Sequence, residues 1–335
     1  INLIFGLLPI FEYLCAVFFA INIYNSDMIN RLLIRIKTVQ LVYANIQSDQ
    51  PRFTCDEELM ASFESSYQLY NYLLGLIVKV TDYRNDQIEA ARNKYLPSRE
   101  ERFPNTRFVN NQIAKIIRDN SSIMNYCEEH GLFNDFDTET YRAILDQIEK
   151  NPLYMAYMSQ PQAPTFEQDL ELWKEIFNTI IPSCEVLDAT LEDKNIYWND
   201  DLTTIVQFAV KTLSHIKANT EMVKTLGMFR NDDDKNFALS LFHHAIDESH
   251  EYLQLIDKTA ENWEANRMAM MEKVIMICAL AEIKNFPDIA IRVSLNEYIE
   301  LAKHYCKADS ARFINGILDR IVSQWKTEGL IFKAK

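Results

Sequence analysis

Histidine and carboxylate side chains stand at helical spacing in one stretch of this chain. His243, Asp247 and His250 are four and three residues apart, so a helix would place all three on one face. Imidazole and carboxylate groups bind metals, and helical bundles hold di-metal centres with such ligands. Those centres repeat the motif on several helices, and this sequence has no second Asp-x-x-His element. We therefore expect a solvated histidine-rich face with no metal or other cofactor.

Two amphipathic helices are predicted between residues 291 and 322. The first has a capping-box signature, because the Ser294 hydroxyl and the Glu297 carboxylate can each take a free backbone N–H. Asp309 or Ser310 can cap the second helix. The two predicted buried stripes are Leu295, Ile299, Ala302 and Cys306, then Phe313, Ile314, Ile317, Leu318 and Ile321. Gly316 costs the second helix about 1 kcal/mol relative to Ala, which favours another backbone passing close by.

These residues resemble the carboxyl-terminal signature of the NusB family of bacterial transcription antitermination factors. In that family a V-A-I-N-E-A-I-E-L-A-K segment is followed by a short E-D-S turn and by K-F-V-N-G-V-L-D. The counterparts here are residues 293–297, 299–303, 309–310 and 312–319. The helix that follows Met28 also resembles the family's first helix, R-x-x-x-R-x-x-A-x-Q-A-L-Y.

The resemblance implies an all-α fold, in which a NusB-like helical bundle is interrupted by a large, acidic, mainly helical insertion. We assign the bundle to residues 28–81 and 236–325, the insertion to 82–235 and a tail to 326–335. Within the insertion we expect a loop at 84–110, helices near 110–128, 138–150, 165–188 and 200–225, and a turn at 231–236. Thr165 and Gln168 form a second capping-box signature.

Residues 1–27 do not fit the bundle. Residues 1–24 carry a single charge, Glu12, and are long enough to span a bilayer, but no basic region precedes them. The expected explanation is that the natural protein starts at Met28 and that residues 1–27 are translated upstream sequence. A membrane anchor is the alternative.

NusB proteins pair with NusE, a ribosomal protein of the small subunit, and bind the boxA element of nascent ribosomal RNA. The resemblance thus implies a cytoplasmic, non-catalytic factor that binds boxA-like single-stranded RNA with NusE and joins the transcribing RNA polymerase complex. Self-association as a homodimer is left open. Carried over by position, the implied contacts with NusE are Tyr43 and Glu272. Those with RNA are Arg31, Arg35, Arg292, Asp309, Ser310, Arg312 and Phe313.

Each implied contact has a structural alternative. Arg31 and Arg35 suit phosphate, but they also suit an ordinary solvated helix face. Phe313 can stack on an unpaired base, yet an aromatic residue on such a stripe usually belongs to the core. Asp309 can cap a helix, and Tyr43 can be a buried aromatic with a wet hydroxyl.

Composition excludes several other classes. The 6 glycines never cluster, so a Rossmann fingerprint and a P-loop are both absent. The 6 cysteines are scattered without metal or disulfide spacing, which indicates a reducing compartment.

Charge gives the main objection to RNA binding, because the formal net charge is −14. Basic residues outnumber acidic ones by three in 28–52 and again in 284–335, so the acidity is concentrated in the insertion and the segments beside it. Leu32 and Leu33 stand where family members usually have arginine, which predicts weak affinity for RNA alone. The alternative function is therefore a NusB-like scaffold for protein partners with weak or no RNA binding.

Overall fold

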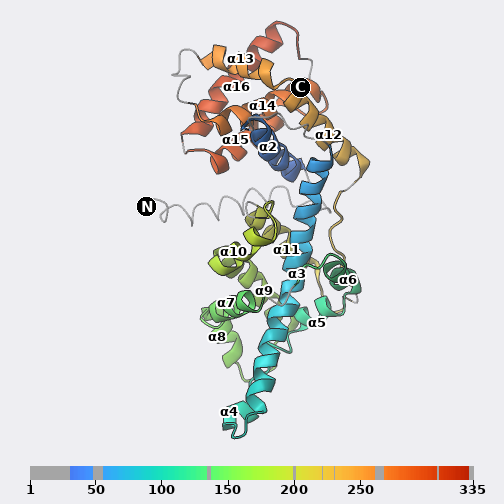
Figure 1. Ribbon diagram of the computed structural model, residues 1–335, viewed down its shortest axis with the longest axis vertical. Helices are drawn as coiled ribbons and strands as arrows, with labels where there is room; N and C mark the ends of the chain where they lie inside the picture. The colour runs from blue at the N-terminus through green and yellow to red at the C-terminus, as the bar shows by residue number, and fades with distance from the viewer. Residues whose placement is uncertain are drawn as a thin grey trace. The chain divides into compact units, whose positions relative to one another are not determined.

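The computed structural model describes residues 31–47, 56–133, 137–198, 201–220, 222–229, 231–260, 268–307 and 309–331. Within these ranges the regular elements are helices, which confirms the all-α prediction (Figure 1). None of the described helices is long and apolar enough to cross a bilayer. The predicted upstream extension or anchor, residues 1–27, lies outside the described residues.

Contacts divide the described chain into two compact units. The split unit combines two distant segments, residues 31–63 and 228–331, and the middle unit comprises residues 64–227. The boundaries that we assigned from the sequence, 81/82 and 235/236, remain a proposal.

The split unit is built around one helix whose middle is fully enclosed. α14 (Met270–Asn285) packs against α2 (Arg31–Gln47), α12 (Asp232–Asp247), α13 (Ser249–Ala260), α15 (Ile291–Tyr305) and α16 (Ser310–Thr327). Every side chain from 274 to 283 is buried. This stretch is apolar on all sides apart from Glu282, and a helix of that kind is stable only inside a core. Helices from the two distant segments thus share one core, and Figure 1 shows α2 in blue beside the orange and red helices.

The middle unit is assembled along most of α3 (Asp56–Arg92), whose first turns belong to the split unit. Its other helices are α4 (Arg99–Arg102), α5 (Gln112–Arg118), α6 (Ser121–Glu129), α7 (Thr138–Ile148), α8 (Pro152–Ser159), α9 (Phe166–Glu175), α10 (Glu185–Lys194) and α11 (Leu202–His215). The capping box of Thr165 and Gln168 is confirmed at the start of α9. The helical stretch predicted near 165–188 is interrupted, because α9 is followed by a π-helical turn (Ile176–Ile180) and a 3₁₀ turn (Ile181–Ser183) before α10 begins at Glu185. Pro182 lies in the 3₁₀ turn, where its missing N–H ends the helical hydrogen bonding.

The predicted capping box at Ser294 and Glu297 is wrong. α15 begins one turn earlier, at Ile291, and the Ser294 hydroxyl donates to Glu282 inside the core. The buried positions move accordingly: Tyr298, Leu301 and Ala302 are buried, whereas the predicted Leu295 and Ile299 are only half-buried. A long-range partner for serine has therefore replaced the local one that the spacing predicted.

Two predicted irregular segments are partly helical. The turn predicted at 231–236 is the first turn of α12, since the Asn231 side chain accepts a hydrogen bond from the Asp234 amide. Three aspartates in that turn complement the helix dipole. The loop predicted at 84–110 begins only after Arg92, where α3 ends, and it contains the short α4.

The expectation of a close backbone at Gly316 is wrong. A Cβ built on Gly316 meets nothing within 4 Å, and the residue is exposed. The tightly packed glycine is instead Gly75 in α3, where a Cβ would lie 2.7 Å from the Phe133 ring and 3.2 Å from Cys127 Sγ.

Candidate nucleic-acid interface

Arg35 is the most deeply enclosed of the predicted RNA contacts, with only 3% of its side chain exposed. It lies on α2 among apolar residues that face the core, including Leu33 and Val39, so the helix carries its guanidinium inward. Nε and Nη2 donate to the two carboxylate oxygens of Glu282, each at 2.8 Å. Nη1 reaches Glu297 Oε2 at 3.3 Å. Arg35 therefore joins α2 to α14 and α15 and offers almost no surface to phosphate.

Glu282 is the centre of this buried polar cluster and was missed by the sequence analysis. Besides Arg35 it accepts the Ser294 hydroxyl at 2.7 Å and the Tyr298 hydroxyl at 3.3 Å. A bidentate arginine and two hydroxyls offset the cost of enclosing its charge. The available signal was a single acidic residue in the apolar run of α14, since a buried carboxylate needs partners.

Titration shifts agree with a cluster that holds its charge. Burial alone would lower the pKa of Arg35, but its hydrogen bonds and attraction to Glu282 raise that pKa above the ordinary value. Burial also raises the pKa of the Tyr298 phenol, so this hydroxyl stays a hydrogen-bond donor. Burial raises the pKa of Glu297 as well, and the nearby Arg35 offsets only part of that shift. Arg35 therefore remains cationic between its carboxylate partners.

Arg31 lies one turn before Arg35 and is half-exposed. Its guanidinium stacks over the Phe237 ring, 4.4 Å from the centroid, and its Nε lies 3.6 Å from Asp234 Oδ1. The Arg31 guanidinium thus already interacts with two side chains of α12. Leu32 and Leu33, which replace the family's usual arginines, are buried in the core and add no cation to this surface.

Arg292 and Arg312 are both exposed. Each lies in the first turn of its helix, α15 or α16. Within the described part of the chain, neither side chain takes part in an ion pair or a hydrogen bond. These two guanidinium groups can therefore meet phosphate without first losing a protein partner.

The start of α16 joins a predicted RNA contact to a predicted NusE contact. Ser310 is buried and its hydroxyl donates to Glu272 Oε1, while Glu272 Oε2 accepts the Ala269 amide at 3.0 Å. Asp309 occupies the position before the helix and is exposed, but its side chain makes no capping hydrogen bond. Phe313 is half-buried rather than fully in the core.

Tyr43 is also half-buried, one turn after Gln40, whose amide donates to the Tyr305 hydroxyl at 3.3 Å. It therefore lies past the point where α2 meets the end of α15. Neither Tyr43 nor Phe313 is placed like a fully enclosed core aromatic.

The predicted residues thus form two groups rather than one cluster. Arg31 and Arg35 lie by the Glu282 end of α14, whereas Ser310 lies by its Glu272 end. Ten residues of helix separate these ends, a distance of about 15 Å. A single strand of a few nucleotides could span both groups.

The histidine-rich segment does not assemble a metal site in the described residues. His243 Nε2 lies 2.5 Å from Asp56 Oδ1, and His244 Nδ1 lies 3.1 Å from Glu248 Oε1. Each of these imidazoles has a carboxylate neighbour of its own, so the helical spacing alone did not gather ligands.

Comparison with known proteins relates residues 203–323 to one family. The model of the NusB family matches residues 203–323. The protein named transcription antitermination protein NusB from Chloroherpeton thalassium is 38% identical over 100 residues, which is 30% of this chain and 47% of that protein. The protein of that name from Koribacter versatilis is 37% identical over 97 residues, 29% of this chain and 66% of that protein.

A third relative, from Dictyoglomus turgidum, is 44% identical over 72 residues, 22% of this chain and 50% of that protein. The chain thus spans about half to two thirds of the length of these curated relatives. No solved structure matches the chain. The matched region contains nearly all of α11 and α16 and the whole of α12 to α15, and with them Glu272, Arg292 and Arg312. The chain therefore carries a NusB family domain in residues 203–323.

Proposed function

We propose that this protein is a non-catalytic transcription antitermination factor. In this proposal it binds boxA-type single-stranded RNA together with the ribosomal protein NusE, and acts in the transcribing RNA polymerase complex during ribosomal RNA synthesis. The relatives that it matches are named transcription antitermination proteins, which supports the general role. A homodimer also remains part of the proposal. It would form through the surface proposed for NusE.

The observation that carries the RNA proposal is the pair of exposed, unpaired arginines in the described split unit, Arg292 and Arg312. Arginine is well suited to phosphate because its planar fork presents several donors. Exposed Asp309 can hydrogen-bond a base edge, and half-buried Phe313 can present part of its ring for stacking. Arg31 contributes through its half-exposed guanidinium.

Arg35 and Ser310 take a different role in this proposal. Both side chains are buried and engaged by carboxylates, Arg35 by Glu282 and Ser310 by Glu272. We assign them to positioning: Arg35 fixes α2, and Ser310 fixes the start of α16 on which Asp309 and Arg312 stand. The NusE surface is proposed at Tyr43 and Glu272.

Salt-dependent binding to a boxA-like single strand, with NusE present, tests this assignment. Removing both exposed cations in an Arg292→Ala/Arg312→Ala variant should weaken binding. It should also reduce the slope of log affinity against log salt by about 1.4, since each phosphate contact on a single strand contributes about 0.7. The control is Lys258→Ala/Lys326→Ala, which removes two exposed charges of the split unit that the proposal does not use. Equal slopes in the two variants would overturn the assignment.

The scaffold alternative keeps one specific observation in its favour. Two cations of α2 already have partners within the protein, since Arg35 is buried against Glu282 and Arg31 lies against Asp234 and Phe237. A scaffold would bind NusE or another protein while showing no preference for boxA over a scrambled strand. That result, with NusE present, would replace the RNA proposal by the scaffold.

A further inference from the structure

The segment that follows α3 exposes large apolar side chains outside the family-matched region. Tyr95 is 97% exposed, Leu96 78% and Phe103 79%. We call residues 92–107 the tip. Three such side chains within nine residues form an unusually apolar surface for a solvated loop, and exposed apolar patches commonly mark interaction sites.

The tip is basic within an acidic unit. Residues 64–227 hold 25 Asp or Glu against 16 Lys or Arg. The tip reverses this balance, with five cations and two carboxylates: Arg92, Lys94, Arg99, Arg102 and Arg107 against Glu100 and Glu101. An anionic partner is therefore favoured at this place and disfavoured over most of the surrounding unit.

Contacts inside the tip leave two of its arginines available. Lys94 pairs with Glu101, and Arg92 pairs with Glu89. Arg99 and Arg102 are exposed, and in the described residues their side chains have neither an ion pair nor a hydrogen bond. They stand in the short α4, between the exposed aromatic residues in sequence.

The tip is also held in a defined conformation. Ser98 and Glu101 form a reciprocal capping box at the start of α4, with hydrogen bonds of 2.7 and 3.1 Å. Asn105 donates to the Met158 carbonyl at 2.8 Å, and Arg107 donates to the Gln160 carbonyl at 2.6 Å. Its cations and aromatic rings are thus presented from an anchored backbone, which lowers the ordering cost of binding.

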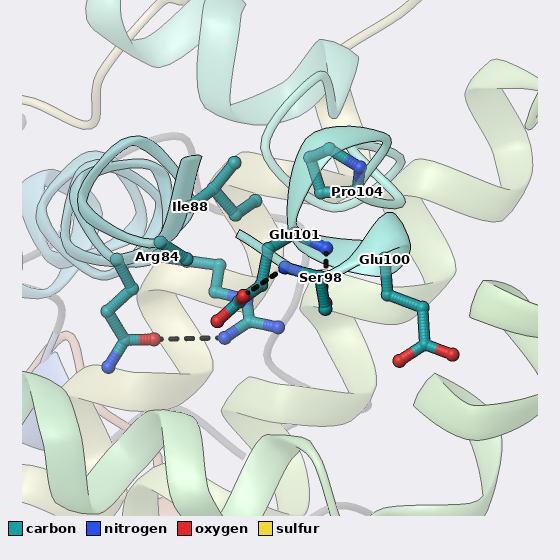
Figure 2. A pocket seen from close by; sticks show the side chains of 8 residues that line it. Arg84, Ile88, Ser98, Glu100, Glu101 and Pro104 are labelled. Atoms are coloured by element: carbon teal, nitrogen blue, oxygen red, sulfur yellow. Dashed lines mark hydrogen bonds between the residues drawn. The ribbon is translucent and has the colours of Figure 1, made fainter. Parts of the chain in front are cut away.

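A shallow hollow of about 380 Å³ lies between the last turns of α3 and the tip. Its wall is apolar at Ile88, Ala91 and Pro104, while Arg84, Gln87, Ser98, Glu100 and Glu101 supply polar groups. Figure 2 shows the Arg84 and Ile88 side chains beside the Ser98–Glu101 cap, with Pro104 beyond it. A flat, polar-edged ring could lie against such a wall and find donors and acceptors at its rim.

We propose that the tip binds single-stranded RNA. Arg99 and Arg102 meet phosphates, the exposed rings of Tyr95 and Phe103 stack on unpaired bases, and the hollow receives a base edge. Cations interleaved with exposed aromatic rings are the arrangement that single strands favour, since every base has a face for stacking. A duplex hides its bases and would leave both rings without a partner. An acidic protein segment would use the cations and gain less from the rings.

The tip lies outside the family-matched residues and is a second site, separate from the boxA interface of the proposed function. The probe is therefore a fluorescent oligouridylate without any boxA sequence, bound to the full chain without NusE. Failure at the tip would leave the boxA test untouched, and failure of the boxA test would leave this one standing.

Two variants separate the charge contribution from the stacking contribution. Arg99→Ala/Arg102→Ala should lower the slope of log affinity against log salt by about 1.4, because two phosphate contacts are lost. Tyr95→Ala/Phe103→Ala should weaken binding about tenfold or more while leaving that slope unchanged, because stacking is not ionic. Tyr95→Phe, which keeps the ring, should retain the original affinity.

The matched control is Arg142→Ala/Lys150→Ala, which removes two exposed cations elsewhere in the middle unit. It should change neither affinity nor slope. Equal loss in this control and in the Arg99/Arg102 variant would overturn the proposal, since binding would then follow net charge alone. An unchanged affinity in the Tyr95/Phe103 variant, or equal binding of polyglutamate, would also overturn it in favour of an acidic protein partner.

Discussion

One arginine of the split unit and two arginines of the middle unit lie in opposite environments. In the split unit Arg35, which the sequence assigned to RNA, is enclosed with Glu282 and Glu297. In the middle unit Arg99 and Arg102, for which no role was predicted, are exposed and without partners among the described residues. A motif position thus specifies the chemistry of a side chain, while the packing of its helix decides whether that chemistry faces solvent.

Helix glycines show the same contrast. Gly316 in the split unit, within the family-like motif, has open space around its missing Cβ, whereas Gly75 in the middle unit lies against the Phe133 ring. The unit with the recognised motif leaves its central helix glycine free, and the unit without one uses a glycine for packing. This comparison makes four substitutions informative.

The largest expected effect is that of Glu282→Gln. The change removes the charge that balances buried Arg35, and breaking a buried ion pair costs about 3–5 kcal/mol. Urea unfolding, together with hydrogen exchange of the α14 amides, would measure the loss in the split unit. The control is Glu300→Gln, a half-buried carboxylate whose pair with Lys303 should contribute less than about 1 kcal/mol. Equal losses in the two variants would show that Arg35 is not held by Glu282.

Gly75→Ala should be the next largest. The new Cβ would meet the Phe133 ring at 2.7 Å, and that ring is stacked on Tyr72, so space must be made by displacing both. Overpacking of this kind costs about 1–3 kcal/mol. Hydrogen exchange along the second half of α3 would report it, and a stabilised middle unit would show that the ring moves aside freely.

Gly316→Ala should change stability in the opposite direction. Nothing lies within 4 Å of the new Cβ, so the substitution gains helix propensity of about 1 kcal/mol without a clash. Thermal unfolding of the full chain would detect the rise. Together with Gly75→Ala it tests the contrast between units directly, since loss of stability here would reveal a packing role that the structure lacks.

Glu297→Gln should have the smallest effect, and that effect should depend on pH. Burial raises the pKa of Glu297 above its ordinary value of 4.5, so its ionised form is less favourable in the folded chain than in the unfolded chain. The natural protein therefore loses the stability that protonated Glu297 provides as pH rises from 4.5 through the raised pKa. The neutral amide of the Gln variant does not titrate and loses nothing.

The stability of the Gln variant relative to the natural protein should accordingly increase over that pH window and then level off. Urea unfolding at several pH values would measure it. If the Gln variant instead becomes less stable than the natural protein as pH rises, the attraction of Arg35 outweighs the effect of burial on the Glu297 carboxylate.

Much of the helical architecture could be predicted from local patterns. The capping box of Thr165 and Gln168 was found because all its partners lie within four residues. The same pattern failed at Ser294, where the hydroxyl binds Glu282, twelve residues away in sequence. For the candidate site, the resemblance assigned Arg35, Arg292 and Arg312 alike to RNA contact, and only the structure separates the buried Arg35 from the exposed Arg292 and Arg312.

The amino-acid sequence by itself determined that the chain is helical, the capping box of Thr165 and Gln168 and the resemblance carried by residues 291–322, because these follow from composition and spacing along one chain. Only the tertiary structure decided which polar side chains are buried and paired in the core. Arg35 and Glu282 stand 247 residues apart, and no local pattern reports that they meet. Their enclosure follows from α2 and α14 sharing one core, where the low dielectric makes an unpaired charge too costly and a paired one stable.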